Sequence, residues 1–142
     1  MERTLLVIKP DAVEDHHVGE IIAMLEKKGL FIRNIRMDQW SREKAEGFYS
    51  VHLGKPFYER LVAFMSSAPV IEVLLEHENC VKFVREIIGA TNPEEASEGT
   101  IRKLFAHNVT VNAVHASDSL ENAEREIKYI FGDNFDGGRT RN

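Results

Sequence analysis

The sequence has almost no cysteine, since Cys80 is the only one among 142 residues. A single cysteine cannot form an internal disulfide, and it cannot build a zinc site of the multi-cysteine kind. No apolar run approaches the roughly 20 residues that a membrane-spanning helix needs, and we expect no signal peptide at the N-terminus. These features favour a cytoplasmic protein.

Basic residues are also in the minority, with 18 Lys and Arg against 23 Asp and Glu, for a formal net charge of −5. Domains that bind duplex nucleic acid usually need a cationic surface to release counterions from phosphates. A nucleic acid is therefore disfavoured as the main partner, although a locally basic cleft can still bind a small phosphorylated ligand. The hydrophobic content of 43% is ordinary for one globular domain.

The common nucleotide and hydrolase motifs are missing from the sequence. It contains no GxxxxGK[ST] phosphate loop, no GxGxxG, no HExxH, no GxSxG and no HRD/DFG pair. Any nucleotide chemistry must therefore use scattered side chains.

The hydrophobic pattern alternates between short strands and amphipathic helices. We expect strands at 4–8, 31–38, 70–75 and 109–114, and helices at 18–28, after Ser41, after the 54–56 break, at 80–88 and at 119–131. Residues 90–108 show no strong period, and a long irregular segment in a compact chain is usually functional or disordered. Its Thr, Asn, Pro, Gly and Arg residues favour function.

This order of elements suits an α+β split βαβ sandwich. A small doubly wound sheet would give a similar pattern, and spacing alone leaves both open. The sequence has no repeat and no linker between domains, so we expect one domain over residues 1–142, of which about 134–142 form a C-terminal tail.

His115 has the sequence context of a nucleophile, at a predicted strand end just before a helix. Imidazole is partly neutral near pH 7, and a helix N-terminus favours an incoming anion. Glu126 borders the apolar stripe of the following helix and could bind one ring nitrogen, which would leave the other free to attack. The alternative is that His115 only caps the helix, with Ser117 or Asp118 satisfying its free amides.

Several blocks of sequence then point to one family. The run Asn112-Ala113-Val114-His115-Ala116-Ser117-Asp118-Ser119 resembles the active-site motif of the nucleoside diphosphate kinases. Four further blocks resemble that family in the same order: Arg3-Thr4 with Ile8-Lys9-Pro10-Asp11-Ala12, Gly47-Phe48-Tyr49 with His52 and Lys55-Pro56-Phe57, Gly89-Ala90-Thr91-Asn92-Pro93, and Gly99-Thr100-Ile101-Arg102. The resemblance runs from Arg3 to about Phe131.

The resemblance implies a ferredoxin-like fold, with helices packed on an antiparallel sheet and an inserted helical hairpin. It also implies an enzyme that moves the γ-phosphoryl group of a nucleoside triphosphate, typically ATP, to a nucleoside diphosphate. The cycle would be ping-pong, through a phosphohistidine on His115. Two rivals are a non-catalytic nucleotide-binding or regulatory module on the same fold and a nucleic-acid-binding protein.

The same resemblance assigns residues to the phosphoryl groups. Arg85, Thr91 and Arg102 would bind phosphate oxygens, and arginine suits this role because its fork donates paired charge-assisted hydrogen bonds. The Tyr49 hydroxyl would reach the transferred group, and so would Lys9.

Other residues would bind the nucleoside. Lys9 and Asn112 would contact the ribose hydroxyls, while Phe57 would stack on the base and Val109 would cover its other face. Stacking is open to every base, which would explain a broad choice of nucleotides.

The remaining implied roles concern the histidine and the metal. Ser117 and Glu126 would orient His115. Mg²⁺ would sit mainly on the nucleotide phosphates, and Asp118 would touch it through water.

Each assignment has a structural alternative when it is taken singly. Tyr49 and Phe57 sit at helical spacing and could belong to the core. Lys9 could simply end a strand, Thr91 could form a turn before proline, and Arg85 could lie on a solvated helix face.

The family pattern also implies a homo-oligomer. Glu98, the pair Lys103-Leu104, the loop at 15–17 and the short tail depart from that pattern. The loop containing Glu98 and the tail help to build subunit contacts in the family. These departures bear on the assembly state, for which a homo-hexamer is the first choice and a tetramer the second.

Overall fold

A four-stranded antiparallel sheet forms the centre of the computed structural model, which describes residues 1–134. The strand order is β2-β3-β1-β4, and the strands are β1 (Glu2–Ile8), β2 (Phe31–Asp38), β3 (Val70–His77) and β4 (Val114–Ala116). This order confirms the split βαβ sandwich and excludes the doubly wound alternative, whose neighbouring strands would be parallel. Most of the predicted tail, residues 135–142, lies outside the described part of the chain.

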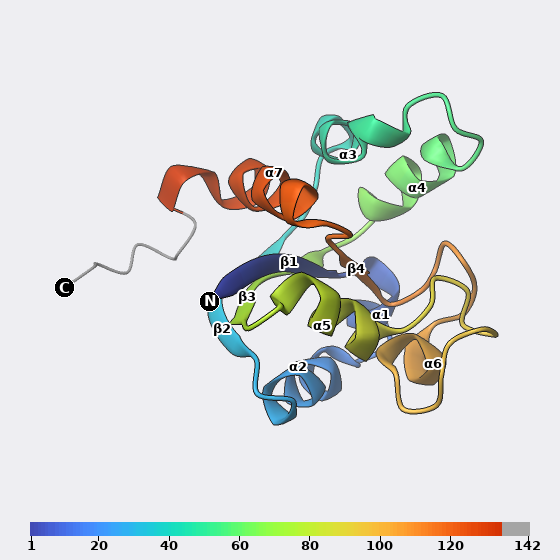
Figure 1. The fold of residues 1–142 in the computed structure, drawn as a ribbon. Helices are drawn as coiled ribbons and strands as arrows, with labels where there is room; N and C mark the ends of the chain where they lie inside the picture. Colours follow the sequence, from blue (N-terminus) through green and yellow to red (C-terminus); the bar gives the residue numbers. More distant parts are fainter. Residues whose placement is uncertain (135–142) are drawn as a thin grey trace.

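Helices cover both faces of the sheet (Figure 1). On one face lie α3, α4 and α7, and on the other α1, α2, α5 and α6. The bounds are α1 Pro10–Glu14, α2 Val18–Lys27, α3 Arg42–Phe48, α4 Tyr58–Met65, α5 Cys80–Ile88, α6 Ile101–Phe105 and α7 Leu120–Phe131, with 3-10 turns at Ser50–His52 and Gly132–Asn134. Segment α3 to α4 is the inserted hairpin. Within residues 1–134, no helix is long and apolar enough to cross a membrane.

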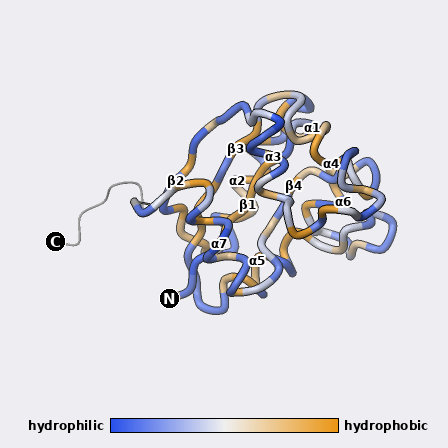
Figure 2. Tube along the Cα trace, turned by 90° about the horizontal axis from the view of Figure 1, so that it is seen from above, coloured by the Kyte–Doolittle hydropathy of each residue, from blue (hydrophilic) through white to orange (hydrophobic). Residues whose placement is uncertain are grey.

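Strand β1 separates two hydrophobic cores because its side chains alternate between the faces of the sheet. Leu5 and Val7 belong to the cluster under α3, α4 and α7, whereas Leu6 and Ile8 belong to the cluster under α2 and α5. All four are fully buried. Figure 2 shows hydrophobic segments of β1 near the middle of the trace and hydrophilic segments mostly at its periphery. A central strand covered on both faces explains the continuous apolar run at 5–8.

The loop before β4 corrects the sequence-based prediction of a strand at 109–114. The strand starts only at Val114, because residues 109–113 form an irregular loop. The Asn108 side chain accepts hydrogen bonds from the backbone N–H groups of Thr110 and Val111, and Ala113 has a left-handed φ of 76°. These local bonds compete with strand pairing. Two short helices, α1 and α6, were not predicted either.

His115 lies in the middle of β4, where it pairs with Val7 of β1. The following helix α7 is capped by Ser119, whose hydroxyl accepts a hydrogen bond from the Asn122 N–H. The alternative in which His115 caps this helix is therefore wrong. Because Val7 faces α7, the paired His115 is directed to the same face of the sheet.

A buried carboxylate fixes the base of the helical hairpin to the sheet. Glu72 of β3 is fully buried and accepts hydrogen bonds from Trp40 Nε1 at 2.7 Å and Arg36 Nε at 2.6 Å. Trp40 packs in turn against Phe48 at the end of α3. A buried charge held by two donors is costly to disrupt, so this cluster defines where the hairpin leaves the sheet.

Gly89, which ends α5, packs closely against Thr100 of the following segment. Its φ is +88°, and an added Cβ would lie 2.5 Å from Thr100 Oγ1. Gly54 has the same φ of +88° but nothing within 4 Å of an added Cβ. We expect Gly89→Ala to lower the free energy of unfolding by about 2–4 kcal/mol, since backbone strain and overpacking add. Gly54→Ala should cost only about 1 kcal/mol.

Urea denaturation of both variants measures this difference. Equal losses in the two proteins would show that the contact between Gly89 and Thr100 is not tight.

Candidate active site

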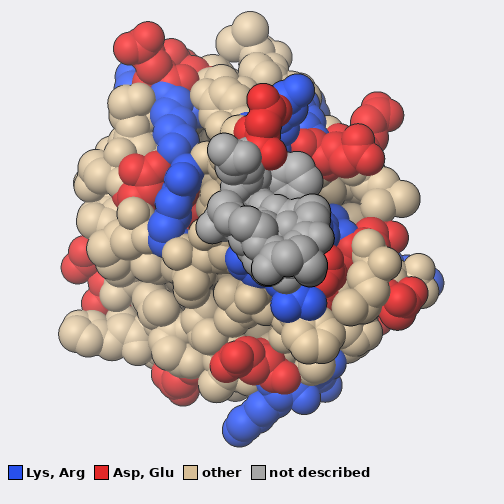
Figure 3. All heavy atoms as spheres, turned by 90° about the vertical axis from the view of Figure 1, so that its left-hand side faces the viewer, with Lys and Arg blue, Asp and Glu red and all other residues tan. Residues whose placement is uncertain are grey.

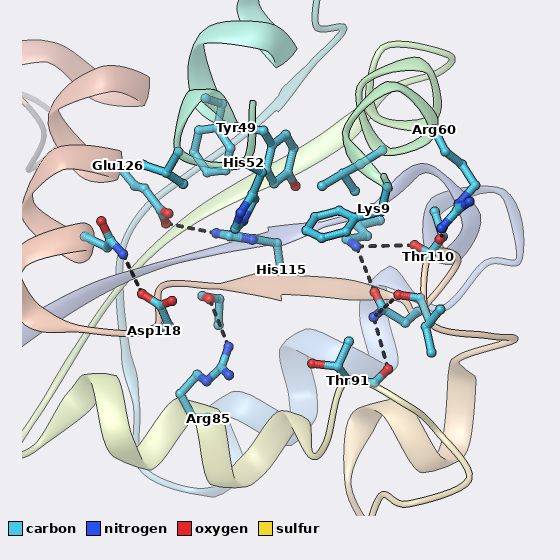
Figure 4. A pocket seen from close by; sticks show the side chains of 18 of the residues that line it. Lys9, Tyr49, His52, Arg60, Arg85, Thr91, Thr110, His115, Asp118 and Glu126 are labelled. Carbon is cyan, nitrogen blue, oxygen red and sulfur yellow. Dashed lines mark hydrogen bonds and ion pairs between the residues drawn. The ribbon is translucent and has the colours of Figure 1, made fainter. Parts of the chain in front are cut away.

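A cleft of about 430 Å³ opens between the helical hairpin, β4, α5 and the loops at 89–100 and 106–113. Figure 4 shows side chains from all of these elements converging on it. The predicted site residues that line it are Lys9, Tyr49, Phe57, Arg85, Thr91, Arg102, Val109, Asn112, His115, Asp118 and Glu126. Ser117 is the one predicted residue outside the lining, and it lies fully buried beside Glu126. The structure therefore brings the predicted set together.

The His115 ring is held from one side only (Figure 4). Its Nε2 lies 2.9 Å from Oε1 of Glu126 on α7, and the same oxygen accepts a 2.7 Å hydrogen bond from the Ser117 hydroxyl. Nδ1 has no hydrogen-bond partner within residues 1–134. A carboxylate on Nε2 favours the tautomer that is protonated there, which leaves the Nδ1 lone pair free in the cleft.

Glu126 is a charged acceptor despite its burial. Burial alone would raise the pKa of this carboxyl, but the electrostatic interaction with the His115 ring and the hydrogen bonds from His115 and Ser117 outweigh it, so the net pKa is lowered. An ionised Glu126 can only accept hydrogen bonds, and its two donors therefore have fixed directions.

Aromatic rings pack around the histidine. Phe48 and Tyr49 meet the His115 ring edge-on, with centroid distances of 5.0 and 5.8 Å. The Tyr49 hydroxyl is buried without a hydrogen-bond partner in the described part of the chain. Burial, with the charge of Glu126 second, raises the pKa of this phenol. Tyr49 therefore stays protonated, and its hydroxyl is a donor without a partner among the described residues.

Three of the predicted cleft residues are cations without a carboxylate partner. Among the described residues, no carboxylate oxygen lies within 4.0 Å of the charged nitrogens of Lys9, Arg85 or Arg102. Arg102 instead donates to the backbone carbonyls of Gly89 and Val114, at 3.1 and 2.9 Å. Burial, reinforced by the charge of Arg85, lowers the pKa of Arg102 to about 10. Lys9 and Arg102 are buried, and an unpaired buried cation is costly, so an anion in the cleft would offset that cost.

Burial also has a large effect on Lys9. The residue is 5% exposed, and burial together with the charge of Arg102 lowers its pKa to about 7. Its Nζ donates to Asn112 Oδ1 at 2.8 Å. The amide of Asn112 donates in turn to the carbonyls of Thr91 and Val109. The Asn112 side-chain amide thus connects Lys9, which follows strand β1, to the loops that contain Thr91 and Val109.

The cleft also has apolar lining. Phe57 immediately precedes α4, and Val109 lies on the loop before β4. Both side chains line the cleft together with Leu61. A flat ring could insert between these side chains, because stacking needs only an apolar face on each side.

Asp118 is the predicted metal contact. A 2.6 Å hydrogen bond from Asn122 lowers the pKa of Asp118, so the carboxylate is charged. Residues 1–134 contain no group of three His, Cys, Asp or Glu side chains that could hold a metal ion.

Five polar residues of the cleft were missed: His52, Arg60, Thr110, Asn122 and Arg125. Helical spacing could have found two of them, since Arg60 follows Phe57 by three residues and Asn122 follows Asp118 by four. For His52 and Arg125, no spacing in the sequence distinguishes a cleft residue from a surface residue.

Charge outside the cleft is mixed on the face that Figure 3 shows. There, basic and acidic side chains are interleaved rather than gathered into a continuous basic surface. Interleaved charge gives little attraction for a nucleic acid backbone on this face.

Comparison with known proteins gives one consistent answer. The sequence matches the family "Nucleoside diphosphate kinase" over residues 2–135. It is 55% identical over 131 residues to the nucleoside diphosphate kinase of Chlamydia trachomatis serovar L2, covering 92% of this chain and 93% of that protein. It is 54% identical to nucleoside diphosphate kinase 2 of Protochlamydia amoebophila, with 92% of each chain covered.

Solved structures agree with the sequence relatives. The nucleoside diphosphate kinase of Aquifex aeolicus has a TM-score of 0.91 and 45% identity, with 93% of this chain and 96% of that chain covered. The enzyme from Encephalitozoon cuniculi has a TM-score of 0.92 and 38% identity, with 95% and 92% covered. With its fold, its cleft and these relatives in agreement, the chain belongs to the nucleoside diphosphate kinase family.

Proposed function

We propose that this phosphotransferase carries the γ-phosphoryl group between nucleotides on Nδ1 of His115. The observation that carries the proposal is one imidazole, fixed through Nε2 to Glu126, whose free Nδ1 shares a cleft with Lys9, Arg85 and Arg102. A non-catalytic module would need neither the fixed tautomer nor the free nitrogen.

The proposed cycle has two symmetric displacements. The Nδ1 lone pair attacks the γ-phosphorus of a nucleoside triphosphate, typically ATP, and the bond to the bridging oxygen breaks, so the diphosphate leaves with that electron pair. Glu126 stabilises the positive ring, and Ser117 keeps the carboxylate in place. A second diphosphate then attacks the phosphohistidine with its terminal oxygen, which restores the free imidazole.

The remaining cleft residues would hold the transferred group. Arg85, Arg102 and the Thr91 hydroxyl would bind phosphate oxygens, and the unpartnered Tyr49 hydroxyl would donate to the group in transit. Lys9 would lie beside the same group. These donors are in place before the ligand arrives, which favours the transition state because no reorganisation is needed.

The nucleoside would occupy the other end of the cleft. Lys9 and Asn112, already hydrogen-bonded to each other at 2.8 Å, would contact the ribose hydroxyls. The base would lie between Phe57 and Val109, which line that end of the cleft.

A divalent metal, which we propose to be Mg²⁺, would be held mainly by the nucleotide phosphates, with Asp118 reached through water. When bound, it would neutralise charge on the transferred group. Transfer in EDTA at the full rate would contradict this role.

The first prediction concerns the nucleophile. Incubation with γ-labelled ATP and Mg²⁺ should label the protein, and the label should be acid-labile and base-stable. Addition of any nucleoside diphosphate should discharge it. His115→Ala should show no label, because no other imidazole in the cleft has its second nitrogen held by a carboxylate. Phe57→Ala is the matched control, since it should weaken nucleotide binding while still forming the labelled protein. Label that persists in the His115→Ala protein would move the nucleophile to another residue.

A second prediction follows from the pKa of Lys9, which is about 7. At about pH 8 the amine is mostly neutral in the free protein, and a bound phosphate should raise its pKa because an anion favours the charged form. Nucleotide binding should then take up close to one proton more in the wild type than in Lys9→Met. Calorimetry in two buffers of different ionisation enthalpy measures this uptake. Equal uptake in both proteins would show that Lys9 is charged before the ligand binds.

We further propose a homo-oligomer, with a hexamer first and a tetramer second. Support comes from edge strand β2, whose apolar side chains Phe31, Ile35 and Met37 are 48%, 46% and 61% exposed. An edge strand with exposed apolar groups is a natural site of pairing with another chain.

Sedimentation equilibrium tests the assembly. The wild type should have six times, or else four times, the 16.2 kDa mass of one chain. Ile35→Lys should reduce that mass, because it places a charge on the exposed edge strand, whereas Leu53→Lys at the tip of the hairpin should not. A monomeric wild type would overturn the proposal.

Two broader proposals complete the functional picture. Residues 1–142 would act as one domain, which a single cooperative unfolding transition would support and two separate transitions would contradict. The cytoplasm would be its location, in keeping with the single buried cysteine. Recovery of the chain from a membrane or secreted fraction would contradict that location.

A further inference from the structure

Arg60 lines the cleft, yet none of the proposed steps uses it. It lies on α4, three residues after Phe57, so both side chains project from the same face of that helix. Figure 4 shows Arg60 reaching from α4 toward Thr110 on the opposite loop, at the end of the cleft that is away from Glu126 and Asp118.

The guanidinium of Arg60 is anchored by one of its three nitrogens. Its Nε donates to Thr110 Oγ1 at 3.0 Å, while its two terminal nitrogens make no hydrogen bond with any residue in 1–134. No carboxylate among the described residues lies within 4.0 Å of it either. The anchored fork therefore presents several free N–H donors in the cleft that Phe57 and Val109 also line.

The loop that holds Arg60 is itself fixed. Thr110 accepts a 3.4 Å hydrogen bond on its carbonyl from Lys9, and its N–H donates to Asn108. The anchor of Arg60 is thus connected to the lysine at the floor of the cleft. Preorganised donors lose less entropy when they bind a ligand than mobile ones do.

We propose that Arg60 reads the edge of the nucleotide base and gives the enzyme a preference for 6-oxopurines, guanine above all, over adenine. This inference rests on the proposed function, because it requires the base to lie between Phe57 and Val109. A guanidinium fork matches the O6 and N7 acceptors of guanine, whereas adenine presents an N6 donor where O6 would be. Two donors then face each other, and adenine loses one bond of the pair.

The test measures only the second half-reaction, the transfer from phosphoenzyme to a nucleoside diphosphate. Phosphoenzyme prepared with labelled ATP is mixed with GDP, IDP or ADP, and the second-order rate constant of label discharge is measured. GDP and IDP should react roughly five- to tenfold faster than ADP, because both carry O6 and N7 and an exposed bidentate contact gives discrimination at the low end of its usual range. 7-Deaza-GDP, which lacks N7, should fall between GDP and ADP.

Three variants show whether Arg60 is the cause. Arg60→Met should bring the ratio of GDP to ADP close to one, and Arg60→Lys should lower it as well, because lysine keeps the charge but has no fork. Lys82→Met, on an exposed position of α5 outside the cleft lining, should keep the wild-type ratio.

Failure of this inference is distinct from failure of the proposed function. A wild-type ratio in Arg60→Met, or IDP that behaves like ADP, would overturn the role of Arg60 while leaving the phosphoenzyme intact. Absence of label on His115 in the wild type would overturn the proposed function itself.

Discussion

The hydrogen bond between His115 Nε2 and Glu126 Oε1 joins edge strand β4 to helix α7, and the organisation of the cleft depends on it. The bond needs β4 in register with β1, so that His115 faces α7, and it needs α7 packed on the sheet through Ile127 and Ile130. Ser117 occupies a second donor position on the same carboxylate oxygen. The core therefore determines which ring nitrogen is free, since any shift of strand or helix would separate the pair.

The second constraint is electrostatic. Lys9, Arg85 and Arg102 are held beside His115 by backbone carbonyls and an amide rather than by carboxylates. In the ligand-free protein this arrangement is unfavourable, as the lowered pKa values of Lys9 and Arg102 indicate. A phosphate would stabilise it, so the protein stores part of its binding free energy as unpaired positive charge. The whole chain has a net charge of −5, so this local excess of positive charge cannot be recognised from the composition.

Much of the fold could be predicted from sequence because its strands and longer helices have strong periods. The run at 5–8 and the stripe of α5 are local signals that packing does not override. The strand predicted at 109–114 was wrong because Asn108 side-chain bonds and the left-handed Ala113 keep that segment irregular. Short helices α1 and α6 escaped detection since five residues give too little period to recognise.

The sequence by itself determined which residue types are available and, through the resemblance to nucleoside diphosphate kinases, which of them to expect in one site. It also determined the alternation that places Leu5 and Leu6 in different cores. Only the tertiary structure decided that Nδ1 rather than Nε2 of His115 is free and that Arg60 reaches Thr110 across the cleft. It also decided that no carboxylate oxygen within residues 1–134 lies within 4.0 Å of the charged nitrogens of Lys9, Arg85 or Arg102. The reason is physical: hydrogen-bond partners and charge pairs depend on distances between segments far apart in the chain, and local propensity carries no information about those distances.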